Sequence, residues 1–211
     1  MAEPLILALA SHKGGTGRTT TALTLAWAFG QIGHRTILVD ADEQRAATLI
    51  AQDLHGRCHI PNVKVWSGVE ALHQPLDADV VVVDPPALTA ETAPSVLQHV
   101  HGVVLTSLAD PMSIRTVPAA AAVIEQTKAS NPRLELLGLL ICMYRAEDPV
   151  QVAMLTRMHQ AHRDLVLDPV IPFQANLRDW PMQPGTAPAE GPARDAILRF
   201  ARHFAPILAG T

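Results

Sequence analysis

A glycine-rich stretch between an apolar run and a helical pattern constrains the fold of this chain more than any other feature. Residues 5–10 are apolar, and the residues after position 20 have the apolar spacing of a helix. The stretch between them reads Ser11-His12-Lys13-Gly14-Gly15-Thr16-Gly17-Arg18-Thr19-Thr20. Glycines at such a boundary let a buried strand turn into a helix, so that backbone N–H groups and the helix N-terminus point at one place. The pattern therefore predicts a phosphate-binding loop.

This loop matches the P-loop pattern at nearly every position. Arg18 stands where a lysine is usual, and a guanidinium is planar and bulkier than an ammonium group. A second basic residue, Lys13, precedes the first glycine, which an ordinary P-loop does not need. We expect the Thr19 hydroxyl to reach Mg²⁺. The residues predicted to bind the nucleotide are Gly14, Gly15, Thr16, Gly17, Arg18, Thr19 and Thr20.

Two motifs carry a resemblance to a known family. The stretch from Lys13 to Thr20 resembles the deviant P-loop of the ParA/MinD group of ATPases. This resemblance implies that Lys13 reaches across a dimer interface to the phosphates bound by the other subunit. The stretch Asp40-Ala41-Asp42-Glu43-Gln44 is similar to the group's Asp-x-Asp-Pro-Gln motif, with Glu43 in place of proline. It implies that Asp42 orients the attacking water and that Asp40 supports the water shell of Mg²⁺, although either aspartate alone could instead cap the next helix.

Three further stretches resemble the same family. Asp84 ends the apolar run 80–83 at the edge of the sheet where the glycine loop lies, so it is placed to hold Mg²⁺ through water. It resembles a Walker B aspartate, but Pro85 follows directly where the family has one intervening residue, and a plain strand-end aspartate is the alternative. Pro172 and Phe173 resemble the family's loop near the nucleotide base. Cys142 takes the place of a threonine or asparagine near that base.

The composition and the order of patterns predict the fold class. Hydrophobic residues make up 48% of the chain and charged residues 17%, which excludes disorder and fits central strands that are apolar on both faces. We expect one domain over residues 1–211, with an α/β, doubly wound, mostly parallel sheet and helices on both faces, the fold of P-loop nucleoside triphosphatases. The expected strands are 5–10, 36–39, 63–66, 79–84, 102–107, 134–143 and 166–171.

Several classes of protein are excluded by what the sequence lacks. Its apolar runs are too short to span a bilayer, and its start lacks the pattern of a secretion signal. Cys58 and Cys142 lie far apart and form no C-x-x-C pair, which favours a reduced cytoplasmic setting. The lack of paired cysteines also argues against an iron–sulfur carrier. One group of possible zinc ligands consists of His55, Cys58, His59 and His73. The spacing of these residues matches no closed zinc site, so we favour a surface loop there.

The last helical pattern, residues 193–204, has an apolar face and several arginines. The first interpretation is a terminal helix that packs its apolar face on the domain. The second adds a patch for non-specific DNA, formed by Arg194, Arg199 and Arg202, and a local patch is required because the net charge is −4. The third, ranked last, is a MinD-like membrane anchor.

The resemblance implies a ParA-type partition ATPase. ATP and Mg²⁺ would close two subunits into a dimer that binds DNA non-specifically, and hydrolysis stimulated by a ParB-like partner would release it. Lys13, Arg18 and Asp42 are the expected catalytic residues, and the expected location is cytoplasmic and nucleoid-associated. Two alternatives stay open. The first is a scaffold that binds nucleotide and barely hydrolyses it, which Arg18, Glu43 and the shortened Asp-Pro-Pro motif favour. The second is a MinD-like positioning ATPase at a membrane surface.

Overall fold

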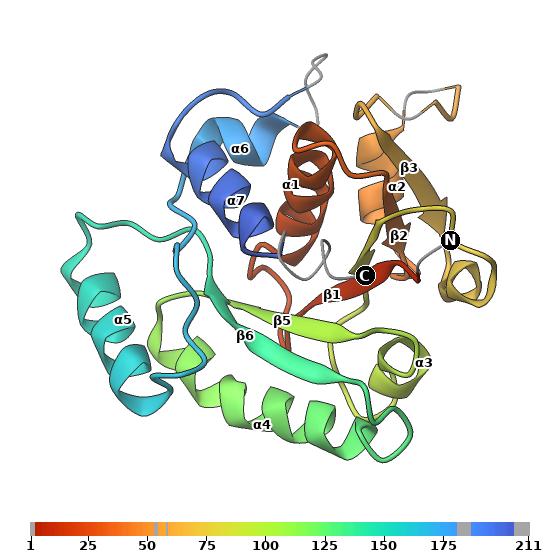
Figure 1. The fold of residues 1–211 in the computed structure, drawn as a ribbon. Helices are drawn as coiled ribbons and strands as arrows, with labels where there is room; N and C mark the ends of the chain where they lie inside the picture. Colours follow the sequence, from red (N-terminus) through yellow and green to blue (C-terminus); the bar gives the residue numbers. More distant parts are fainter. Residues whose placement is uncertain (1–2, 53–54, 58, 181–186, 205–211) are drawn as a thin grey trace.

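Six parallel strands form the sheet at the centre of this computed structural model, which describes residues 3–52, 55–57, 59–180 and 187–204 (Figure 1). The strand order is β3-β2-β4-β1-β5-β6, and β1, the strand before the glycine loop, lies between β4 and β5. The strands are β1 (Leu5–Ala10), β2 (Thr36–Asp40), β3 (Val63–Ser67), β4 (Val80–Asp84), β5 (Gly102–Ser107) and β6 (Glu135–Ile141).

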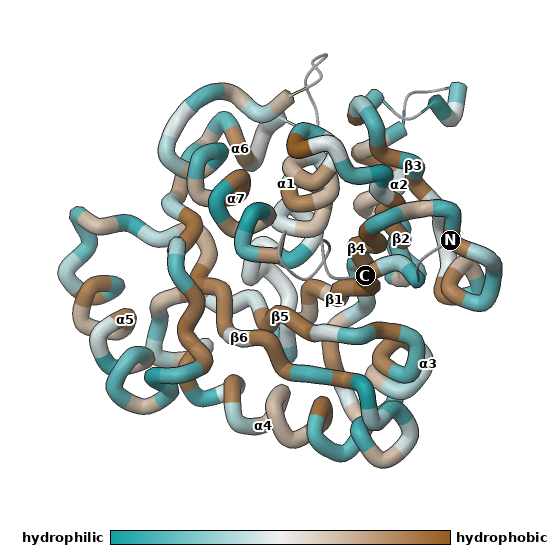
Figure 2. The backbone as a smooth tube through the Cα atoms, viewed as in Figure 1, coloured by the Kyte–Doolittle hydropathy of each residue, from teal (hydrophilic) through white to brown (hydrophobic). Residues whose placement is uncertain are grey.

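Helices cover both faces of this sheet. They are α1 (Arg18–Gln31), α2 (Ala46–Ala51), the 3₁₀ helix η1 (Val69–His73), α3 (Ala93–Leu97), α4 (Pro111–Thr127), α5 (Pro149–Ala161), α6 (Ala175–Asp179) and α7 (Pro192–His203). Alternate residues of β1 point to opposite sides: Leu7 and Leu9 join a core with α1, α2 and α7, whereas Ile6 and Ala8 join a core with α3, α4 and α5. Figure 2 shows the strands as an apolar centre. The predicted doubly wound α/β fold is confirmed, and the sheet is entirely parallel.

The helix after the glycine loop is buried on nearly every side. Helix α1 begins at Arg18, directly after Gly17, and its Trp27 and Phe29 are fully buried. Helix α7 packs beside α1 on the same face of the sheet, burying Ile197 and Phe200 (Figure 1). The terminal helix therefore completes the fold by packing its apolar face, as the first interpretation of residues 193–204 expected.

One predicted strand is absent as such. Residues 166–171 run beside β6 and exchange backbone hydrogen bonds with it, such as Ile171 N–H to the Ile141 carbonyl at 2.7 Å, but they form only an isolated bridge between Val166 and Leu139. Pro169 has no N–H to donate, so a continuous ladder cannot form across it. Within the described ranges, no helix is long and apolar enough to cross a membrane.

Candidate functional site

The glycine loop lies at the carboxyl end of β1, where the sheet and the N-terminus of α1 meet. Gly15 and Gly17 have φ of +78° and +84°, a conformation that favours glycine. A Cβ added at Gly14 or Gly15 would meet nothing within 4 Å, so another molecule can approach the backbone closely there. An open hollow of about 280 Å³ is lined by Gly15, Gly17, Arg18, Thr19, Thr20 and Met143. An anion in this hollow would meet backbone N–H groups and the positive end of α1.

Thr16 differs from its neighbours in the loop. Its side chain is buried, and its hydroxyl lies 3.0 Å from the Thr106 hydroxyl in β5. The Thr16 side chain therefore fixes the loop to the sheet. Among the atoms of Thr16, the backbone N–H is the one suited to a phosphate.

Arg18 points toward the acidic residues at the strand ends. Its Nε donates to Asp84 Oδ1, its Nη1 to Ser11 Oγ and its Nη2 to Asp42 Oδ2, each at 3.2 Å. Its side chain is 12% exposed. One guanidinium thus joins the glycine loop to the ends of β2 and β4, a set of contacts that needs the planar fork of arginine and that the point charge of lysine cannot reproduce.

Asp84, at the end of β4, is the more deeply buried of the two aspartates that contact Arg18. Its side chain is 1% exposed, and within the described residues Oδ2 accepts no hydrogen bond. Burial raises the pKa of Asp84 to about 6; Arg18 and Thr19 oppose the rise, and the charge of Asp40 adds to it. A buried carboxylate oxygen without a donor, beside the Thr19 hydroxyl, fits the oxygen-rich environment of a hydrated Mg²⁺.

Asp40 and Asp42 have different partners, although they are two residues apart. Asp40 is fully buried, and its carboxylate accepts the Thr48 N–H in the first turn of α2 at 2.7 Å and the Asp42 N–H at 3.3 Å. Asp40 therefore caps the next helix, the alternative that the sequence left open. Asp42 accepts the Gln44 N–H at 2.9 Å and binds Arg18, and its side chain is 21% exposed. Of the two, Asp42 is the one that solvent reaches.

Lys13 stands on the outer side of the glycine loop and is exposed. It lies near the start of α4, beside Asp110. Burial raises the pKa of Asp110, but hydrogen bonds from Ser113 and Met112 lower it below the usual range, and the charge of Lys13 adds a smaller lowering. In the part of the chain that the structure describes, Lys13 forms no ion pair. Its ammonium group is available to another molecule.

Pro172 and Phe173 lie beside the loop, as expected for residues near a nucleotide base. The Phe173 N–H donates to the Tyr144 carbonyl at 2.8 Å, and the Arg145 guanidinium lies 3.6 Å over the Phe173 ring. A small cavity of about 50 Å³ is lined by Gly17, Thr20, Thr21, Cys142, Met143, Pro172, Phe173, Gln174 and Leu177. It shares Gly17, Thr20 and Met143 with the hollow at the loop. Together the two spaces suit an elongated ligand with phosphates at one end.

Sequence reasoning missed four residues of this site. Ser11 lies inside the motif, and its hydroxyl accepts a hydrogen bond from Arg18. Its short polar side chain, next to the glycine loop, is the signal that could have identified it. Met143 has φ of +54° and Arg145 stacks on Phe173, but no sequence pattern signals either feature. Tyr144 contributes through its backbone carbonyl. Cys142, which the sequence analysis had already named, has its thiol 3.6 Å from the Thr21 hydroxyl, and burial raises its pKa to about 11.

The three arginines predicted to bind DNA do not share one environment. Arg194 lies 5.3 Å over the Trp27 ring and donates to the Pro188 carbonyl at 3.4 Å. Arg199 and Arg202 are exposed on α7. Arg194 is therefore engaged within the fold, and the exposed positive charge of α7 comes from the other two.

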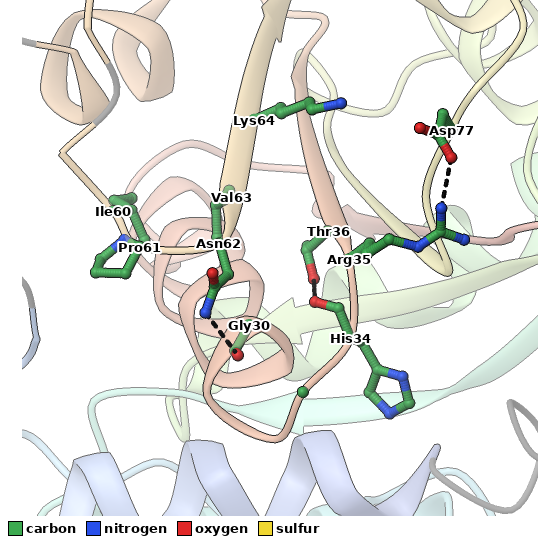
Figure 3. A pocket seen from close by; sticks show the side chains of 11 residues that line it. Gly30, His34, Arg35, Thr36, Ile60, Pro61, Asn62, Val63, Lys64 and Asp77 are labelled. Atoms are coloured by element: carbon green, nitrogen blue, oxygen red, sulfur yellow. Dashed lines mark hydrogen bonds and ion pairs between the residues drawn. The ribbon is translucent and has the colours of Figure 1, made fainter.

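A second hollow lies at the opposite end of the strands. It measures about 550 Å³ and is lined by residues from the end of α1 and the starts of β2 and β3, including His34, Arg35, Lys64 and Asp77 (Figure 3). Arg35 forms an ion pair with Asp77 across its rim. None of the predicted nucleotide-binding residues lines it.

A parallel sheet whose first strand enters a glycine loop at a helix N-terminus, with an aspartate at the end of the adjacent strand, defines a P-loop nucleotide-binding protein. The family model of the CobQ/CobB/MinD/ParA nucleotide binding domain matches residues 7–184, and the chain belongs to this family. The predicted resemblance is confirmed.

Two relatives cover most of the chain. The chromosome-partitioning ATPase Soj of Thermus thermophilus is 27% identical, with 96% of this chain and 95% of Soj covered. The chromosome partitioning protein ParA of Caulobacter vibrioides is 29% identical, with 85% of each chain covered.

Solved structures share the fold at lower identity. The septum site-determining protein MinD of Pyrococcus horikoshii, complexed with Mg-ADP, has a TM-score of 0.74 and 19% identity, covering 99% of this chain and 100% of that chain. The McdA–ATP complex of Cyanothece has a TM-score of 0.77 and 14% identity, covering 98% of each chain.

Proposed function

We propose that this chain is a ParA-type partition ATPase whose ATPase domain spans residues 1–211. One observation carries the proposal. Thr19, Asp42 and Asp84 gather beside the glycine loop at one edge of the sheet, while Lys13 stands exposed on the outer side of the same loop. The first set suits Mg·ATP, and Lys13 suits the phosphates of a second subunit.

The loop backbone from Gly14 to Thr20 would bind the phosphates, and Pro172 and Phe173 would lie beside the base. Thr19 and Asp84 would hold Mg²⁺, Asp84 through water, and the ion would offset the phosphate charge. Asp40 would act indirectly, because both of its oxygens already accept backbone N–H groups. Support comes from MinD and McdA, which were crystallised with Mg-ADP and ATP.

Arg18 and Asp42 would act on the terminal phosphate and the attacking water. Phosphates compete with Asp42 and Asp84 for the Arg18 guanidinium, because all three are anionic. When Arg18 turns to the phosphates, Asp42 loses its cation and one carboxylate oxygen becomes free to orient water. Chemistry would therefore depend on how readily Arg18 leaves the two carboxylates.

Two subunits would close face to face, with each Lys13 reaching the other subunit's phosphates. The triphosphate favours this dimer because it adds a negative group that both lysines sense, and hydrolysis removes that group. Sedimentation velocity without nucleotide, with Mg·ADP and with a non-hydrolysable Mg·ATP analogue tests this step. We expect a dimer only with the triphosphate. Lys13→Ala should remove it, while Lys64→Ala, at another exposed lysine, should not; identical sedimentation in all three conditions contradicts the proposal.

The dimer would bind DNA non-specifically through a patch that includes Arg199 and Arg202, and a ParB-like partner would stimulate hydrolysis. The support is the partition function named for Soj and ParA. With that function, the protein would act on the nucleoid in the cytoplasm. Co-sedimentation with DNA and with liposomes, at two salt concentrations, distinguishes this proposal from a MinD-like role. Pelleting with liposomes and not with DNA would favour the latter. The apolar face of α7 is buried against α1, which leaves it no lipid-binding face.

A second candidate is a scaffold that binds nucleotide and hydrolyses it very slowly. The observation that favours it is the set of three hydrogen bonds that hold Arg18 on Ser11, Asp42 and Asp84. Turnover measured with the partner present separates the two candidates, because a scaffold stays slow even when it dimerises.

A further inference from the structure

Two histidines far from the glycine loop face each other across two separate elements. His73 ends η1, and His99 follows α3. Their Nε2 atoms are 3.0 Å apart, their ring centroids are 4.6 Å apart and the rings are inclined by 64°. His73 is exposed and His99 is half-buried, so solvent reaches the pair from the side of His73. The pattern of histidines and cysteines in the sequence grouped His73 with His55 and His59, and the fold instead pairs it with His99.

The spacing of the two nitrogens suits two ligands of one metal ion. A divalent transition metal binds imidazole nitrogen at about 2.0–2.1 Å, so two nitrogens at a right angle around it lie about 2.9 Å apart. In a tetrahedral site they would lie about 3.4 Å apart. The observed 3.0 Å is close to the first value, which Ni²⁺ and Cu²⁺ prefer. The simpler alternative is one N–H···N hydrogen bond between neutral rings.

A neighbouring side chain, that of Gln98, favours a ligand role over a simple hydrogen bond. The side-chain amide of Gln98 has its nitrogen 3.0 Å from His99 Nε2, and a flip of that amide would bring its oxygen to the same place as a third donor. Three groups able to donate to a metal thus meet at one exposed point.

We propose that His73 and His99 form a binding site for a divalent transition-metal ion of the Ni²⁺, Cu²⁺ and Zn²⁺ group, completed by Gln98 and water. In the described part of the chain no group of three or more His, Cys, Asp and Glu side chains gathers to hold a metal. The proposed site therefore has two histidine ligands and leaves the other coordination positions open. It is chemically distinct from the Mg²⁺ site proposed at Thr19 and Asp84, because Mg²⁺ prefers oxygen ligands and Ni²⁺ accepts imidazole.

A metal at this point would join two walls of another hollow. That hollow, of about 540 Å³, is lined by Val69 and Glu70 of η1, by Ser95 of α3 and by Asp42, among others. Because His73 ends η1 and His99 follows α3, an ion bound to both would tie these two elements together.

Titration calorimetry of tag-free protein with NiCl₂ and with ZnCl₂, each in excess MgCl₂, tests the site. We expect one ion per chain and an affinity in the micromolar range that Mg²⁺ does not change. His73→Gln and His99→Gln should each weaken binding at least about tenfold, because each removes one of two imidazole ligands. His159→Gln, at an exposed histidine of α5, is the matched control and should leave binding unchanged.

Histidine ¹⁵N NMR of the unmodified protein gives a second measurement that does not depend on variants. Zinc should shift the Nε2 resonances of His73 and His99 and leave that of His159 in place. Absence of binding at millimolar metal, binding that survives both substitutions, or a zinc shift confined to other histidines would overturn the proposal. All three outcomes leave the nucleotide site untested, so the metal site can fail without affecting the proposed ATPase.

Discussion

Two arginines in this molecule each bind two aspartates, at opposite ends of the same sheet. Arg18 lies at the carboxyl end of the strands with Asp42 and Asp84, and Arg35 lies at the amino end with Asp77 and Asp79. Figure 3 shows the pair of Arg35 and Asp77. The surroundings of the two arginines differ. The Arg18 side chain is 12% exposed and that of Arg35 is 55% exposed. The same set of side chains, one arginine with two aspartates, therefore lies in a buried environment at one end of the sheet and in an exposed one at the other.

The difference in burial reverses the effect on the acids. The pKa of Asp79 is lowered, chiefly by its hydrogen bond from Arg35. The pKa of Asp84 is raised to about 6, because burial outweighs the neighbouring Arg18. Water screens the exposed cluster, so its ion pairs contribute little. The buried cluster has one cation for two carboxylates and an unbonded oxygen on Asp84, which leaves it suited to a second cation such as hydrated Mg²⁺.

Arg18→Ala should have the largest effect on this comparison. It removes the cation beside the buried Asp84, and breaking a buried ion pair costs about 3 kcal/mol of the free energy of unfolding. Urea unfolding at pH 7 measures the loss. The same variant should bind ATP weakly. A loss no greater than that of Arg35→Ala would show that the two clusters are equivalent.

The pH dependence of stability should show the burial of Asp84. Its pKa in the folded chain, about 6, lies above the usual 3.8, so between these values the folded chain holds a proton that the unfolded chain has lost. Stability should therefore rise as the pH falls from about 7 to 4, by about 2 kcal/mol from this residue. Asp84→Asn lacks the titrating group, so the unmodified protein should gain stability relative to this variant as the pH falls over the same range. A difference in unfolding free energy between the two proteins that stays constant with pH contradicts a raised pKa.

Arg35→Ala should have the smallest effect. Its partners are solvated, so the urea midpoint should move slightly at low salt and be restored toward the unmodified value at high salt. Nucleotide binding should not change, because Arg35 is at the other end of the sheet. A salt-independent loss of stability would show that the exposed cluster is more than a screened surface pair.

The fold could be predicted from the sequence because its signals are local. Apolar runs with a carboxylate at the end, such as residues 80–84, mark buried parallel strands, and glycines mark the turn into α1. The predicted strand at 166–171 failed because a periodic pattern does not register the missing N–H of Pro169.

The site was harder to predict than the fold. Motif positions placed Thr19, Asp42 and Asp84 at the correct edge of the sheet, but a motif does not give the direction of a side chain. Arg18 turns to two carboxylates, and Asp40 caps α2, for reasons that depend on burial and on donors distant in sequence. The pairing of His73 with His99 likewise depends on the packing of two elements that no spacing rule connects.

ATP turnover by Arg18→Lys, beside the unmodified protein and Arg35→Lys, tests most directly whether the buried arginine restrains hydrolysis. A lysine cannot hold Ser11, Asp42 and Asp84 together, so Asp42 is released and the ammonium is free for the phosphates. We expect Arg18→Lys to turn over about tenfold faster, equivalent to about 1.4 kcal/mol in the barrier, and Arg35→Lys to be unchanged. Turnover by Arg18→Lys that is equal to or slower than that of the unmodified protein would contradict a restraining role for Arg18.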